Sequence, residues 1–269
     1  MSTEAKPDKP KAPQVLIVSG LDPTGGAGFL ADARVVADMG GRAVGVPTAL
    51  TEQDTNNVYA LNAVEHAVVR SLLAALLEDC AGGVHAVKIG MLVTIAQAHA
   101  VAGAMALLPN VPVVWDPVMR SSGGVALMED DAREMAAVLI PRIALMTPNL
   151  LEAQALTGVP VRDRAGMRRA GEMLCEMGAK AVLVKGGHLT GDQAVDVLVR
   201  EGGSALELVA PRVPLDVKTH GTGCVLSTAI ATQLAHGANL FEAASTAKDY
   251  LRRKLKDLRR IGGGARVLV

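Results

Sequence analysis

The chain has 269 residues and equal numbers of basic and acidic side chains, 27 of each, so its formal net charge is zero. This balance argues against a nucleic-acid partner, and an aromatic content of only 2% leaves too few rings for a base-stacking surface. No apolar run reaches the roughly 18 residues that a membrane span needs, so we expect no membrane partner.

The composition changes near the start of the chain. Residues 1–13 are rich in Lys, Pro, Glu and Ala without apolar periodicity, and we predict a disordered tail there. Residues 14–269 are predicted to form a single domain. Three cysteines without a CxxC spacing disfavour a zinc site or a disulfide framework, and they indicate a reducing, cytoplasmic location.

Strands and helices alternate through the first half of the sequence. Short apolar runs predict strands at 15–19, 43–50 and 86–92, and helical spacing predicts helices at 29–39, 66–80 and 95–108. A glycine-rich loop at 20–28 follows the first strand, and Gly permits close approach to a ligand there. The polar segment 51–57 follows a strand end, so we expect a substrate contact or a lid in it.

The second half continues the alternation. We predict strands at 111–115, 144–146 and 181–184 and an antiparallel edge pair at 194–199 and 206–213, and the chain closes with a short apolar end at 267–269. Predicted helices cover 129–139, a segment carrying Glu152, 164–177, a segment opening near 222, and 240–261. The predicted fold class is therefore α/β, a doubly wound and mostly parallel sheet with helices on both faces and a small antiparallel edge.

Polar side chains follow the strand-like runs, where the carboxyl ends of a parallel sheet gather ligands. They are Asp22, Gln53, Lys88, Asp116, Asn149 and Lys185. This pattern predicts one site at that edge without naming its chemistry.

The stretch His220-Gly221-Thr222-Gly223-Cys224 opens directly into an Ala/Leu-rich segment that reads as helix. The unpaired amides of Gly221, Thr222 and Gly223 at a helix N-terminus would form a hole for a phosphate. Cys224 lies in the first turn, where a thiolate is stabilised. The alternative is an ordinary buried cysteine after a loop.

Several blocks of the sequence together resemble hydroxymethylpyrimidine/phosphomethylpyrimidine kinases, members of the ribokinase superfamily. They are 20–28 with Ala31-Asp32, 48–50 with Gln53 and Thr55, 87–92, 116–119, 147–149 with Glu152-Ala153, 184–188 and 220–224. The resemblance implies a ribokinase-like fold that uses ATP and Mg²⁺ to phosphorylate 4-amino-5-hydroxymethyl-2-methylpyrimidine, and its monophosphate as well. It also implies a homodimer.

The resemblance assigns residues to the phosphoryl side of the site. Cys224 matches the base position, which requires a thiol pKa lowered by the helix terminus and a nearby cation; orientation of the acceptor is the alternative task. Asp116 and Glu152 would hold Mg²⁺ through waters. We expect Lys185 to contact the phosphates of ATP. Asn149 and Glu152, one helical turn apart, would face the same phosphates, and Thr219 is a weaker contact. Without the resemblance, Asp116 would read as a helix cap and Lys185 as an exposed lysine.

The resemblance also assigns the acceptor side. Gln53 would hydrogen-bond the pyrimidine, because an amide pairs with both an exocyclic amino group and a ring nitrogen. Asp32 and the backbone of Ala27 and Gly28 would close the pocket, and Met91 would form an apolar wall. Asp32 could instead serve the N-terminus of its own helix. His220 is interpreted as a structural residue of its turn.

Some positions depart from the family pattern. Leu21 and Leu30 replace polar residues, and the chain ends in Gly262-Gly-Gly-Ala-Arg-Val-Leu-Val instead of the usual Gly/His/Pro-rich segment. These changes bear on the identity of the acceptor and on the second phosphorylation, and two alternatives to the expected function stay open. One is a pyridoxal kinase, whose substrate also carries a hydroxymethyl group on a nitrogen heterocycle. The other is a non-catalytic pyrimidine-binding module on the same fold.

Overall fold

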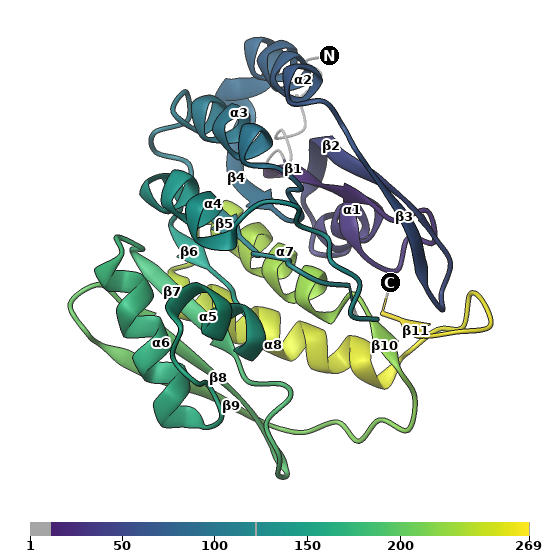
Figure 1. Ribbon diagram of the computed structural model, residues 1–269, viewed down its shortest axis with the longest axis vertical. Coiled ribbons are helices and arrows are strands. Elements are labelled where there is room, and N and C mark those ends of the chain that lie inside the picture. The colour runs from purple at the N-terminus through teal and green to yellow at the C-terminus, as the bar shows by residue number, and fades with distance from the viewer. Residues whose placement is uncertain (1–11, 122, 269) are drawn as a thin grey trace, which may run out of the picture.

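The computed structural model describes residues 12–121 and 123–268, which contain a nine-stranded sheet in the order β3-β2-β1-β4-β5-β6-β7-β8-β9 (Figure 1). The central strands run parallel: β2 (Arg42–Gln53), β1 (Gln14–Leu21), β4 (Val84–Ile89), β5 (Val113–Trp115), β6 (Leu145–Met146) and β7 (Ala181–Lys185). Antiparallel strands complete both edges: β3 (Val58–Ala63) on one side, β8 (Gln193–Arg200) and β9 (Ala205–Pro211) on the other.

The apolar run 15–18 of β1 becomes the centre of the sheet because it is buried on both faces. All four of its residues have no exposed surface, as expected for a parallel strand covered by helices on either side. One face carries α1 (Gly28–Asp38), α7 (Thr222–Ala235) and α8 (Leu240–Lys256). The other carries α2 (His66–Cys80), α3 (Ile95–Met105), α4 (Ala132–Leu139), α5 (Leu150–Thr157) and α6 (Arg164–Glu176), with short 3-10 turns at Ala81–Gly83 and Ile140–Arg142.

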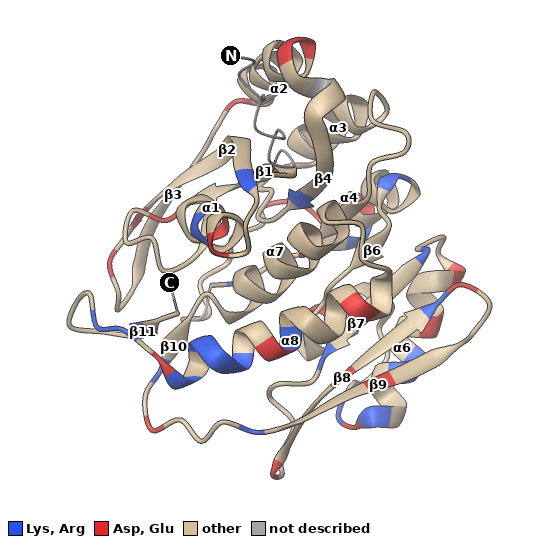
Figure 2. Ribbon diagram, turned by 180° about the vertical axis from the view of Figure 1, so that it is seen from behind, with Lys and Arg blue, Asp and Glu red and all other residues tan. Residues whose placement is uncertain are grey.

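Charged residues of both signs are spread over the helices, as Figure 2 shows. On α8 the basic residues Arg253, Lys254 and Lys256 occupy the last turn (Figure 2), where a positive charge is stabilised by the helix dipole. Within residues 12–121 and 123–268, no helix is both long enough and apolar enough to cross a bilayer.

The fold class predicted from the sequence is confirmed, but the chain contains two features that the apolar pattern missed. The polar segment 51–57 belongs to a hairpin: β2 continues through Gln53, and β3 returns antiparallel to it. A two-stranded parallel ribbon joins β10 (Thr219–His220) to β11 (Arg266–Val267). Both depend on pairing between segments, which no local periodicity encodes. The last helix ends at Lys256, not at residue 261. The predicted tail at 1–13 lies almost wholly outside the described residues.

Candidate functional site

The opening of α7 is built on two glycines that no other residue could replace without movement. Gly221 has a left-handed backbone with a φ of 86°, and a Cβ there would lie 2.0 Å from the carbonyl oxygen of Gly26. The loop between β1 and α1 therefore lies against this helix end. A Cβ on Gly223 would lie 3.2 Å from Lys185 Nζ and 3.3 Å from Asp116 Oδ2. The helix N-terminus thus faces a charged cluster.

That cluster consists of one ammonium group between two carboxylates. Lys185 Nζ lies 2.6 Å from Asp116 Oδ1 and 3.9 Å from Glu152 Oε2. Thr147 donates to Asp116 Oδ1 at 3.2 Å and Ser227 donates to Oδ2 at 3.3 Å, so the Asp116 carboxylate is held from several sides. Asp116 directly follows β5 and Lys185 ends β7, as the pattern of polar residues after strands predicted, whereas Glu152 lies in α5, one helical turn after Asn149.

Burial and mutual charge shift the pKa values of this cluster. Burial raises the pKa of Glu152 to about 7; Lys185 opposes the rise and Asp116 adds to it. Burial alone would lower the pKa of Lys185, but Asp116 and Glu152 outweigh it, so the pKa lies above its ordinary value. The lysine therefore stays charged at neutral pH, while Glu152 sits near its titration midpoint.

Asn149 uses its side-chain oxygen to cap its own helix, α5. Its Oδ1 accepts hydrogen bonds from the amides of Leu151 and Glu152, both at 2.9 Å. The Asn149 amide in turn donates to Glu152 Oε2 at 2.6 Å. This reciprocal capping box satisfies the first turn of α5. Asn149 thus fixes Glu152 in place beside Lys185.

Cys224 is partly exposed in the first turn of α7, and its sulfur faces the amide of Gly28 at the start of α1. The expected thiolate is nevertheless not favoured. Burial raises the pKa of the Cys224 thiol to about 11, and the negative charges of Asp32 and Asp116 add to this effect; Lys88 and the Gly28 amide only partly offset it. The prediction of a lowered pKa was wrong because burial and the two carboxylates outweigh Lys88 and the Gly28 amide.

Asp32 is the partner of Lys88, and it is not in the wall of the pocket. Both Asp32 and Lys88 are fully buried. Lys88 Nζ lies 2.6 Å from Asp32 Oδ2, and Thr228 donates to Asp32 Oδ1 at 2.7 Å. With both carboxylate oxygens engaged and no exposed surface, Asp32 supports the site from beneath instead of touching a ligand. Neither the predicted substrate contact nor the alternative helix cap describes it.

On the acceptor side, a chain of polar contacts runs from Gln53 through His220 to Asp22. Gln53 Nε2 lies 3.4 Å from His220 Nε2, and this nitrogen lies 3.0 Å from Asp22 Oδ2. Burial raises the pKa of Asp22, but hydrogen bonds from His220 and Thr24 outweigh burial and hold the pKa below its ordinary value. Asp22 is therefore an acceptor, and the shared His220 nitrogen carries the proton. Gln53 Nε2 is also an N–H donor, so it forms no strong hydrogen bond to a His220 nitrogen that carries a hydrogen. The Gln53 amide can therefore turn to a ligand.

The loop that begins at Asp22 closes this side of the site. The Asp22 carboxylate accepts a hydrogen bond from the Ala27 amide at 3.0 Å. Gly28 follows with a φ of 59°, and a Cβ there would lie 2.3 Å from the carbonyl oxygen of Gly20. Met91 is 7% exposed and packs with Ala49 in a small apolar cluster. Its role as an apolar wall for a ligand stays a prediction. Thr219 is half-buried in β10 and pairs with Arg266.

Sequence reasoning assigned His220 a purely structural role and gave Asp22 none beyond its place at the sheet edge. Their proximity joins residues 198 positions apart, so only the folded chain reveals it. The polar-after-strand pattern at Asp22 was the one available signal.

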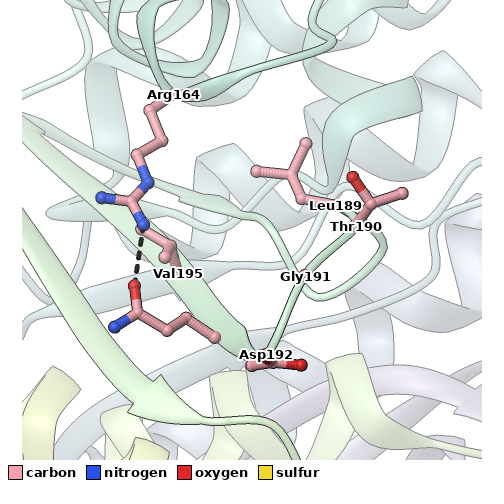
Figure 3. A pocket seen from close by; sticks show the side chains of 7 residues that line it. Arg164, Leu189, Thr190, Gly191, Asp192 and Val195 are labelled. Atoms are coloured by element: carbon pink, nitrogen blue, oxygen red, sulfur yellow. Dashed lines mark hydrogen bonds between the residues drawn. The ribbon is translucent and has the colours of Figure 1, made fainter.

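A separate pocket of about 370 Å³ lies between α6 and the loop leading into β8. Arg164 Nη2 donates to Gln193 Oε1 at 2.9 Å beside this pocket. Figure 3 shows Arg164 among the side chains that line it. Leu189, Thr190, Gly191 and Asp192 line the rest. None of these residues belongs to the cluster around Lys185, and the pocket offers no converging charges for phosphate chemistry.

Comparison with known proteins places these features in context. The sequence profile of the family described as phosphomethylpyrimidine kinase matches residues 22–268. The hydroxymethylpyrimidine/phosphomethylpyrimidine kinase of Aquifex aeolicus is 35% identical over 254 residues, covering 94% of this chain and 98% of that protein. The thiamine biosynthesis bifunctional protein ThiED of Geobacter sulfurreducens is 39% identical over 251 residues. The match covers 93% of this chain, which spans about half the length of that bifunctional relative.

Solved structures share the fold. A pyridoxal kinase of Bacillus subtilis in complex with ADP superposes with a TM-score of 0.85 at 27% identity, covering 96% of each chain. A phosphomethylpyrimidine kinase of Clostridium difficile superposes with a TM-score of 0.76 at 33% identity, covering 90% of this chain and 99% of the other.

Proposed function

Because this chain belongs to the phosphomethylpyrimidine kinase family, we propose that it transfers the γ-phosphoryl group of ATP to 4-amino-5-hydroxymethyl-2-methylpyrimidine. The acceptor atom is the hydroxymethyl oxygen, and the reaction takes place at the carboxyl edge of the sheet. The monophosphate is a second acceptor, and the diphosphate formed from it serves thiamine biosynthesis. Family membership makes the chain a kinase and decides against a non-catalytic binding module. The observation that carries the proposal is the Lys185 ammonium between Asp116 and Glu152, beside the glycine-rich opening of α7.

The phosphoryl side has the two things that such a transfer needs, which are fixed donors and positive charge. The amides of Gly221, Thr222 and Gly223 stand at the start of α7 and would hold the migrating group as charge spreads over its oxygens. Lys185 would shift from its carboxylate partners to the phosphates. The resemblance assigns Thr219 to the nucleotide, but it lies in β10 directly before His220, on the acceptor side.

The two carboxylates fit a magnesium ion that is shared with the nucleotide. Both approach the same cation, the Lys185 ammonium, within 4 Å. The described residues contain no cluster of three or more His, Cys, Asp or Glu side chains suited to a metal. Mg²⁺ commonly uses one or two carboxylates together with phosphate oxygens and waters, so Asp116 and Glu152 suffice. Bound there, the ion would neutralise charge on the phosphates.

For the acceptor we assign Cys224 the task of orienting the hydroxyl. Phosphoryl transfer proceeds through a loose transition state, so the oxygen needs little activation before it attacks. A thiol whose pKa is about 11 is a poor proton acceptor in the ligand-free state, which supports positioning over base catalysis. Gln53 would hydrogen-bond the aminopyrimidine ring, and Met91 would form the apolar wall of the pocket.

Pyridoxal is the second candidate acceptor. The likeness in fold to the pyridoxal kinase of Bacillus subtilis covers almost the whole chain. The acceptor carries the same reacting group, and Leu21 and Leu30 remove polar groups that would favour the pyrimidine. Gln53 favours the aminopyrimidine, because its amide can both donate and accept along one ring edge.

A cytoplasmic location is part of the proposal. Cys80, Cys175 and Cys224 are all free, which supports the proposal that the enzyme works in the reducing cytoplasm.

An ATP-consumption assay tests the function. The pyrimidine alcohol, its monophosphate and pyridoxal are offered separately, and we expect the highest kcat/KM for the pyrimidine alcohol. Higher kcat/KM for pyridoxal would select the second candidate, and no ATP consumption with any of the three would refute the kinase assignment. Cys224→Ala should lower kcat roughly tenfold to a hundredfold through lost orientation, while Cys80→Ala, remote from the cluster, serves as the matched control. A Cys224→Ala enzyme as fast as the control would remove Cys224 from the mechanism.

A further inference from the structure

The last described residues of the chain lie against the acceptor side of the site. Gly264 donates through its amide to Thr55 Oγ1 at 2.9 Å, and the Ala265 amide donates to the Thr55 carbonyl oxygen at 2.8 Å. Thr55 belongs to the turn between β2 and β3. Figure 1 shows the yellow C-terminal segment beside the ends of these strands and next to β10.

The same segment is bonded to the strand that leads into the phosphate-binding turn. β11 pairs with β10 in the register Thr219 with Arg266 and His220 with Val267. The Arg266 amide adds a hydrogen bond to the carbonyl oxygen of Lys218 at 2.8 Å. Val267 is 1% exposed and reaches Gly26, where a Cβ would lie 2.6 Å from its Cγ1.

The C-terminal segment Gly262–Leu268 therefore touches three walls of the site: the β2–β3 turn, β10 and the loop between β1 and α1. Gln53 lies two residues before Thr55, and His220 lies within β10. The C-terminal segment is therefore hydrogen-bonded to both stretches of backbone that position the Gln53–His220 contact. β2 leaves its pairing with β1 at Leu50. Beyond that point the position of Gln53 depends on β3 and on what supports the turn.

We propose that Gly262–Leu268 is a strap that holds the β2–β3 turn over the acceptor pocket, and that Gly264 and Thr55 are positioning residues for Gln53. The inference rests on the proposed function only for the identity of the acceptor. The strap itself is a property of the ligand-free chain. It gives a task to the C-terminal sequence that departs from the family pattern.

Two adjacent glycines provide a matched pair of variants. A Cβ at position 264 would lie 2.2 Å from the Thr55 carbonyl oxygen, a backbone atom that can yield only if the turn moves away. A Cβ at position 263 would meet nothing within 4 Å. Neither glycine has a positive φ, so Gly264→Ala and Gly263→Ala differ in steric contact and not in backbone strain.

Hydrogen exchange and acceptor affinity are measured on both variants. Gly264→Ala should speed amide exchange in 51–61 of the ligand-free protein and weaken pyrimidine binding in calorimetry. It should lower kcat/KM for the pyrimidine roughly tenfold to a hundredfold, with KM for ATP unchanged. Gly263→Ala should match the wild type in all of these. Equal exchange and equal affinity in the two variants would overturn the strap.

A milder pair guards against a variant that fails to fold. Thr55→Val removes the Oγ1 acceptor of the Gly264 amide, whereas Thr55→Ser keeps it, so Ser should restore the acceptor affinity that Val loses. If the hydrogen bond were merely structural, Thr55→Val would lower the melting temperature and leave the acceptor affinity equal to that of Thr55→Ser. If the wild type fails to bind the pyrimidine, the proposed function fails, and the exchange difference between the two alanine variants still decides for or against the strap.

Discussion

Cys224 shows how several weak influences combine at a single residue. The helix N-terminus, the Gly28 amide and Lys88 all favour a thiolate, yet burial together with Asp32 and Asp116 raises the thiol pKa to about 11. The residue type and its place in the first turn predicted the opposite sign. The difference arises because burial disfavours the charged thiolate more strongly than Lys88 favours it, and the Asp32 carboxylate beside Lys88 adds to the rise.

We therefore expect slow alkylation of Cys224 in the ligand-free protein. With a pKa of about 11, the thiolate fraction at pH 8 is on the order of one in a thousand. Iodoacetamide should label the Cys224 peptide more than about tenfold slower than a free cysteine, with the rate still rising above pH 9. Mass spectrometry of the digested protein separates this peptide from those of Cys80 and Cys175. A labelling midpoint at or below pH 8.5 would contradict the shift.

At the scale of elements, α1 and α7 pack against each other on one face of the sheet. Gly28 and Asp32 are four residues apart on α1, as are Cys224 and Thr228 on α7, so each pair shares one helix face. Thr228 donates a hydrogen bond to Asp32, and the Gly28 amide faces the Cys224 sulfur. The Asp32–Lys88 ion pair fills the space between the helices and the strand, and it fixes the two helix ends relative to each other.

Lys88→Met should destabilise the protein because it leaves the Asp32 carboxylate buried without its counter-ion. We expect a loss of about 3–5 kcal/mol in the free energy of unfolding at pH 7, measured by urea denaturation. Burial already raises the pKa of Asp32. The variant's loss should therefore be smallest at acid pH, where the carboxyl takes up a proton, and should grow as pH rises.

The double variant Lys88→Met with Asp32→Leu provides the control, since it removes both charges and should recover most of the lost stability. A loss below about 1 kcal/mol in Lys88→Met alone would show that the pair is not needed to hold the helices.

At the scale of the whole molecule, segments from both ends of the chain meet at one edge of the sheet. The loop after β1, the β2–β3 hairpin, β10 and the C-terminal strap surround the acceptor side, while β5, β6 and β7 supply the phosphate side. The hairpin also forms the outer edge of the sheet, where Tyr59 is 66% exposed and Leu50 is 49% exposed. Edge strands with exposed apolar side chains are usually covered in the working protein.

We predict a homodimer, as the family resemblance implies. Sedimentation velocity should give twice the 27.8 kDa mass of one chain. Tyr59→Lys, which places a charge on the exposed edge, should shift the equilibrium toward the single chain, and Glu65→Lys, outside the hairpin strands, is the control. A wild-type mass of 27.8 kDa across the concentration range would refute the dimer.

Local patterns determined much of this protein: the alternation of strands and helices, the buried central strands, the glycine-rich opening of α7, and the set of polar residues at the carboxyl edge. These follow from periodicity and from backbone requirements that each segment carries within itself. The tertiary structure alone decided the β2–β3 hairpin, the β10–β11 ribbon, the burial of Asp32 with Lys88 and the link from Gln53 through His220 to Asp22. Those features depend on the charge, burial and pairing that distant segments impose on one another, and no stretch of sequence holds that information on its own.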